Sequence, residues 1–177
     1  MHNFGRESKN VFMKRISFFI FLIVLSIITS LTAAGQKSGF SGTWKLDRVK
    51  SVLTEYSPAL TKITVNIKGD SLLTERFYET GDGQVYPFNE NLSLDGTECK
   101  ITIYDMPRKT KALWSEQENS VNLESTTTFY GSNGLEDFVS KEIWKIDKDN
   151  NILTIAFINK VTAGESVGHF LFNKEAQ

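Results

Sequence analysis

Short segments in which apolar and polar residues alternate place the strongest constraint on how this chain can fold. They recur between residues 40 and 173, separated by Gly, Asp and Asn, and none has a convincing helical period. In residues 62–68, for example, Ile63, Val65 and Ile67 fall on one face of an extended segment. The sequence therefore predicts an all-β domain built from about ten short strands.

The predicted strands are joined by connections short enough for neighbours to pair antiparallel. Asp95-Gly96 between two alternating runs is a strong hairpin signal. Pro107 is expected to break the pairing, and the basic cluster Arg108-Lys109-x-Lys111 after it is interpreted as a solvated loop. The expected strands are residues 40–47, 62–68, 71–80, 86–94, 99–104, 110–117, 121–130, 135–146, 152–158 and 166–173.

A meander of this length leaves two unpaired strand edges unless the sheet closes or folds over on itself. Closure gives an antiparallel up-and-down β-barrel of about eight to ten strands, which is the fold we expect. The alternative is an antiparallel β-sandwich. Pairing between the first and last strands would distinguish the barrel from the sandwich.

The N-terminal region has the three parts of a signal peptide in the right order. Met13-Lys14-Arg15 is positive, Ile16–Ile28 is mainly apolar, and Ala33-Ala34-Gly35 supplies small residues for cleavage. An uncleaved membrane anchor is the alternative. We therefore expect residues 1–35 to be an upstream extension plus a signal peptide, and residues 36–177 to be one secreted or periplasmic domain.

Composition excludes several classes of function. The chain has a net charge of −1, and residues 1–35 carry more basic than acidic side chains, so the remainder is acidic and unsuited to nucleic acid or an anionic membrane. Cys99 is the only cysteine, which rules out an internal disulfide. His169 is the only histidine after residue 35, so neither a histidine-based triad nor a multi-histidine metal site is possible. No metal, cofactor or catalytic residue is expected.

Gly42-Thr43-Trp44 resembles the Gly-x-Trp motif at the start of the first strand in lipocalins and related calycins. Lys45-Leu46-Asp47 and Lys50-Ser51 are similar to the opening of small bacterial secreted lipocalin-like domains. The resemblance implies a barrel whose base is closed by Trp44 and whose interior takes a hydrophobic ligand. Lipocalins place an arginine of the last strand against this tryptophan, whereas the last strand here offers Lys174.

Three glutamates fall in phase with apolar residues on predicted strands: Glu90, Glu116 and Glu142. A carboxylate inside a filled core is destabilising unless it is paired, so these faces either line a wet cavity or lie at rims and after bulges. Arg76 is the strand-borne arginine available as a countercharge. We expect Arg76 to pair with Glu90 and to hold the acidic head group of a mostly apolar ligand.

The resulting hypothesis is a non-catalytic barrel that binds a small, partly apolar and possibly acidic ligand. A protein- or glycan-interaction module that uses the outer sheet or loops is the first alternative, and a carboxylate-dependent enzyme is the second. An enclosed cavity of several hundred Å3 would favour the first hypothesis, and exposed aromatic clusters the interaction module. The candidate ligand-binding residues are Arg76, Tyr78, Tyr86, Phe88, Glu90, Trp114, Glu116, Phe129, Glu142 and Trp144.

Overall fold

The computed structural model describes residues 37–54, 59–131, 134–149 and 151–176. The expected upstream extension and signal peptide lie outside these residues. The strands of the described part are β1 (Gly42–Leu46), β2 (Leu60–Lys68), β3 (Ser71–Glu79), β4 (Val85–Ser93), β5 (Cys99–Ile103), β6 (Met106–Ser115), β7 (Ser120–Gly131), β8 (Gly134–Asp147), β9 (Ile152–Val161) and β10 (Gly164–Lys174).

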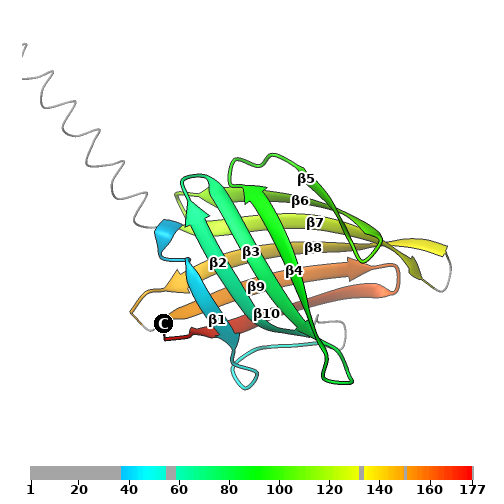
Figure 1. Ribbon diagram of the computed structural model, residues 1–177, viewed down its shortest axis with the longest axis horizontal. Helices are drawn as coiled ribbons and strands as arrows, with labels where there is room; N and C mark the ends of the chain where they lie inside the picture. The colour runs from blue at the N-terminus through cyan, green and yellow to red at the C-terminus, as the bar shows by residue number, and fades with distance from the viewer. Residues whose placement is uncertain (1–36, 55–58, 132–133, 150, 177) are drawn as a thin grey trace, which may run out of the picture. The chain divides into compact units, whose positions relative to one another are not determined.

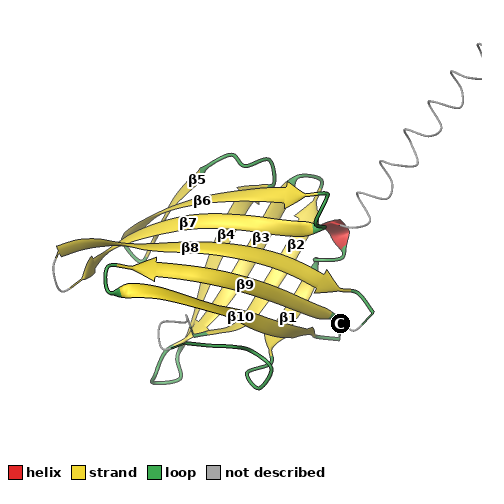
Figure 2. Ribbon diagram, turned by 180° about the vertical axis from the view of Figure 1, so that it is seen from behind, coloured by secondary structure: helices red, strands yellow, loops and turns green. Residues whose placement is uncertain are grey.

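The ten strands form one antiparallel up-and-down sheet in the order β4-β3-β2-β1-β10-β9-β8-β7-β6-β5. The first strand pairs with the last, with Trp44 opposite Lys174, so the sheet curls into a nearly closed barrel. In Figure 1, β2 to β4 cross in front of β6 to β10, and Figure 2 shows the same two walls from behind. The expected barrel is therefore confirmed, and the sandwich is excluded.

The barrel closes where the segment that follows β4 forms hydrogen bonds with β6. The Trp114 amide donates to the Leu94 carbonyl at 2.9 Å, and the Gly96 amide donates to the Ala112 carbonyl at 2.8 Å. Gly96 has a φ of 86°, a backbone conformation that glycine adopts without a steric penalty. Within the described strands, β4 and β5 are the two ends of the sheet order, so the barrel stays open along part of this seam.

The interpretation of residues 107–111 as a break followed by a solvated loop was wrong. Tyr104 and Asp105 both have positive φ and form the two-residue turn of the β5–β6 hairpin. Pro107 lies in β6 opposite Thr102, one pair away from the turn, where an antiparallel ladder of this register needs no amide from it. The β6–β7 ladder begins only at Arg108, so the missing N–H leaves no ladder bond unmade and the strand continues.

Aromatic side chains fill the base of the barrel. Trp44 is only 1% exposed, and its indole N–H donates to the Phe40 carbonyl at 2.9 Å. The Phe40 ring packs edge-on against Trp114 with centroids 5.9 Å apart. Lys174 of the last strand places its ammonium 5.0 Å from the centroid of the Trp44 ring, so a cation does face this tryptophan.

Replacing Trp44 by alanine should remove the centre of this base. We expect Trp44→Ala to lower the free energy of unfolding by about 3–5 kcal/mol, the range for deleting a large buried aromatic side chain. The measurement is chemical denaturation followed by circular dichroism. Tyr130→Ala is the matched control, because Tyr130 is 84% exposed and should change stability very little. Equal stability of the two variants would contradict the central role of Trp44.

Candidate functional site

An ion pair crosses the interior of the barrel between two distant strands. Arg76 of β3 and Glu142 of β8 make two parallel contacts, Nη1 to Oε1 at 2.8 Å and Nη2 to Oε2 at 2.9 Å. The Trp144 indole donates to Glu142 Oε2 at 2.7 Å, and the Arg76 guanidinium lies 5.3 Å from the Trp144 ring centroid. Because β3 and β8 stand five places apart in the strand order, this contact joins opposite walls.

A second buried ion pair lies near the closure seam. Arg108 of β6 contacts Glu90 of β4 through Nε at 3.0 Å and Nη2 at 3.4 Å. The Thr110 hydroxyl donates to the same carboxylate at 2.6 Å, and Arg108 Nη1 donates to the Thr127 hydroxyl at 3.0 Å. The guanidinium also lies 5.2 Å from the Phe88 ring centroid. These contacts satisfy a charge pair that would otherwise destabilise the core.

The expected pairing of Arg76 with Glu90 was therefore wrong. Arg108, which the sequence interpretation left in solvent, takes Glu90, and Arg76 reaches across to Glu142. The error follows from Pro107, because once β6 begins at Met106 the side chain of Arg108 shares the inward face with Thr110 and Ala112. Each buried carboxylate thus has its own arginine.

Burial and pairing act in opposite directions on these charges. Burial works to raise the pKa of Glu142, but the neighbouring Arg76 and hydrogen bonds from Arg76 and Trp144 hold that pKa below its usual value. Burial works against the charge of Arg76, yet Glu142 holds the pKa of Arg76 well above its usual value. The pair is therefore ionised at neutral pH. Burial raises the pKa of Tyr78 beside it, so the phenol remains protonated and able to donate.

A small cavity of about 30 Å3 lies beside the Arg76–Glu142 pair. This volume is enough to hold a water molecule and is far below the roughly 300–1,000 Å3 of most small-molecule pockets. Tyr78 and Phe138 of the lining are only half-buried, so the lining reaches the surface of the barrel. The lining residues are Leu60, Arg76, Tyr78, Arg108, Ser125, Phe138, Ser140, Glu142, Phe157, Asn159 and Phe170.

Two hydrogen-bond donors of this lining lack a partner among the described residues. Asn159 is 3% exposed, and its Oδ1 accepts from the Ser140 hydroxyl at 2.7 Å, while its Nδ2 amide has no partner there. Arg76 Nε is likewise buried without one, since Glu142 engages only the two terminal nitrogens. Unpaired buried donors are destabilising, so each of these two groups would be stabilised by an acceptor.

Six of the ten predicted site residues belong to this region. Arg76, Tyr78 and Glu142 line the cavity itself. The other three contact the two ion pairs: Glu90 binds Arg108, Phe88 lies under the Arg108 guanidinium and Trp144 binds Glu142. Tyr78 and Phe88 also stack, with ring centroids 6.3 Å apart.

The other four predicted residues do not line the cavity. Trp114 packs in the base, and Tyr86 is exposed beside Tyr104. Glu116 does not share the inward face of Trp114, because β6 ends at Ser115 and Glu116 lies exposed in the following turn. Phe129 is half-buried near the end of β7.

Sequence reasoning missed Arg108, Ser125, Phe138, Ser140, Phe157 and Asn159. A signal for Asn159 was present: it follows Ile155 and Phe157 in alternation, but the predicted strand stopped one residue short of it, whereas β9 extends to Val161. The two serines carry no comparable signal, because a serine on a strand is common on either face.

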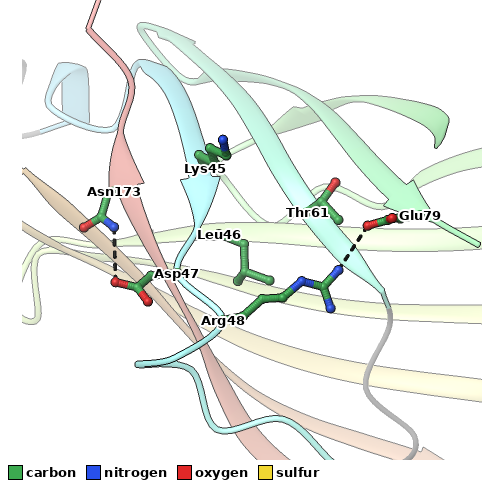
Figure 3. Close-up of a pocket in the computed structure, with 7 residues that line it drawn as sticks. All are labelled: Lys45, Leu46, Asp47, Arg48, Thr61, Glu79 and Asn173. Carbon is green, nitrogen blue, oxygen red and sulfur yellow. Dashed lines mark hydrogen bonds and ion pairs between the residues drawn. The ribbon is translucent and has the colours of Figure 1, made fainter. Parts of the chain in front are cut away.

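A larger cleft of about 560 Å3 lies at the end of β1 (Figure 3). Arg48 reaches across it to Glu79 at 3.1 Å, and the Asn173 amide donates to Asp47 at 3.3 Å. The side chains of Arg48 and Glu79 are largely exposed, and such pairs contribute little. The cleft is therefore a weaker candidate site than the interior cavity, although it is larger.

Other observations limit what the described part of the chain can do. No three His, Cys, Asp or Glu side chains of these residues lie close enough together to hold a metal ion. In the same residues, no helix has the length and apolar character needed to cross a membrane. No protein-family model matches the sequence, and a search of curated proteins finds no match.

Breaking the Arg76–Glu142 pair from one side should destabilise the barrel strongly. We expect Arg76→Met and Glu142→Gln each to lower the free energy of unfolding by about 3–5 kcal/mol, because each leaves the partner charge buried and unpaired. The double variant should lose clearly less than the sum of the two, since it leaves neither charge unpaired. Equilibrium denaturation of all four proteins gives this cycle.

The control uses the neighbouring exposed pair of Lys141 and Glu124, whose contact of 2.9 Å has both side chains more than half exposed. Glu124→Gln should leave the free energy of unfolding nearly unchanged. If Glu142→Gln were as mild as this control, the interior pair would not hold the two walls together.

Proposed function

We propose that the barrel is a non-catalytic, secreted or periplasmic binding protein that takes the head group of a small amphipathic ligand into the interior cavity. The observation that carries this proposal is that two residues lining one cavity, Arg76 and Asn159, each have a buried donor, Nε and Nδ2, without a partner among the described residues. If stability of the fold were the only requirement, apolar residues at these positions would provide more of it.

The surrounding contacts support a preformed site. Glu142 fixes the Arg76 guanidinium through both terminal nitrogens, and Ser140 fixes the Asn159 amide through its oxygen. The remaining N–H groups are thereby held in place before any ligand arrives. Such preorganisation lowers the entropy that binding must overcome.

The size of the cavity limits what enters it. About 30 Å3 admits a head group of very few heavy atoms, so the body of the ligand must remain outside the polar region. Half-buried Tyr78 and Phe138 of the lining provide apolar surface for that body. This division fits a ligand with one polar end and an apolar remainder.

The outer face of β8 to β10 favours an interaction module as a second candidate function. Ile143, Ile158 and Val167 are 43%, 43% and 60% exposed around a shallow groove of about 510 Å3. Contiguous exposed apolar surface is typical of interaction sites. The ion pair in this groove, between Lys141 and Glu124, has both side chains more than half exposed, which is why we rank this candidate second.

Titration with decanamide and decanoate, followed by tryptophan fluorescence, tests the proposed function. Trp144 contacts both members of the interior ion pair, so occupation of the cavity should change its emission. We expect saturable binding of one ligand per protein, weakened at least about tenfold in Asn159→Ala, which removes a buried hydrogen bond donor.

Asn89→Ala is the matched control, because Asn89 lies on the exposed face of β4 and should not affect binding. Native mass spectrometry of the protein purified from its host should also show a co-purified small molecule. Absence of binding by both compounds, with no co-purified molecule, would contradict the proposal and leave the interaction module as the better account.

A further inference from the structure

We infer that the head group recognised in the cavity is uncharged and accepts hydrogen bonds through a carbonyl or hydroxyl oxygen. This inference rests on the proposed function and adds the chemical class of the ligand. It differs from the expectation that Arg76 holds an acidic head group.

The charge balance of the site argues against an anion. Arg76 and Arg108 are matched by Glu142 and Glu90, so the paired charges around the cavity sum to zero. A carboxylate would add one buried negative charge close to Glu142, without a free cation to compensate it among the described lining residues. Burying an uncompensated charge opposes binding strongly.

The geometry of Arg76 shows which of its nitrogens is left without a partner. A guanidinium recognises a carboxylate best through two parallel N–H bonds, and here Glu142 already takes Nη1 and Nη2. Nε is the guanidinium nitrogen that has no partner among the described residues.

The unpaired groups also argue against a cation. Arg76 Nε and Asn159 Nδ2 can only donate. An ammonium would face these two donors and the Arg76 charge, while the Glu142 carboxylate is already engaged by Arg76 and Trp144. A neutral oxygen can accept from Arg76 and Asn159, and a head of this size agrees with a cavity of about 30 Å3.

The test compares ligands of one chain length that differ in the head group: decanamide, decanoate and decylammonium. Decanamide and decanoate have nearly the same shape, so their difference isolates charge. At a pH where decanoate is ionised, we expect wild-type protein to bind decanamide at least about tenfold more tightly than decanoate, and decylammonium most weakly. Isothermal titration calorimetry gives all three affinities.

Glu142→Gln provides a charge swap, because it removes one negative charge with little change of shape. In a variant that keeps the wild-type circular dichroism spectrum, the preference should shift toward decanoate by about tenfold or more. The comparison in wild-type protein tests the inference even if this variant does not fold.

The outcomes separate the inference from the proposed function. Decanoate binding as tightly as decanamide in wild-type protein, with loss in Asn159→Ala, would overturn the neutral head group and leave the binding function standing. Tight decanamide binding that Asn159→Ala does not weaken would overturn the inference by placing the ligand outside the cavity. If none of the three compounds bound, the proposed function and the inference would both fail.

Discussion

The bidentate contact between Arg76 and Glu142 is the interaction on which the interior of this barrel depends. It joins β3 to β8 across the core, and both groups remain charged because each stabilises the ionised form of the other. Two lone charges could not be buried here, since desolvation of each would cost several kcal/mol. The pair also holds Arg76, one of the residues that line the cavity, in one orientation.

The barrel interior is divided into two parts with different chemistry. The base is apolar and filled by Trp44, Phe40 and Trp114, which accounts for stability without a disulfide. The part around Arg76 contains two ion pairs and several hydroxyl and amide groups, and it leaves a cavity of about 30 Å3. We therefore attribute folding mainly to the base, and we propose that recognition belongs to the polar part.

Strand alternation predicted most of the fold, because inward and outward faces of a barrel strand differ in polarity at every second residue. The same alternation put Glu90, Glu116 and Glu142 in phase with apolar residues and left their burial open; Glu90 and Glu142 are buried, and Glu116 is exposed. It failed at Pro107, where a two-residue turn formed by Tyr104 and Asp105 has no sequence signal such as Asn-Gly. Which arginine pairs with which glutamate depends on which strands face each other across the barrel. The local sequence around each residue contains no information about that arrangement.

Nuclear magnetic resonance of the side-chain N–H groups, recorded while decanamide is added, tests the central claim most directly. The account predicts that the Arg76 Nε–H and Asn159 Nδ2 signals shift most and saturate together with the binding isotherm, while the backbone amides of Ile143 and Val167 on the outer face do not move. Shifts confined to that outer face, with both side-chain signals unchanged, would contradict the account and place recognition on the outside of the barrel.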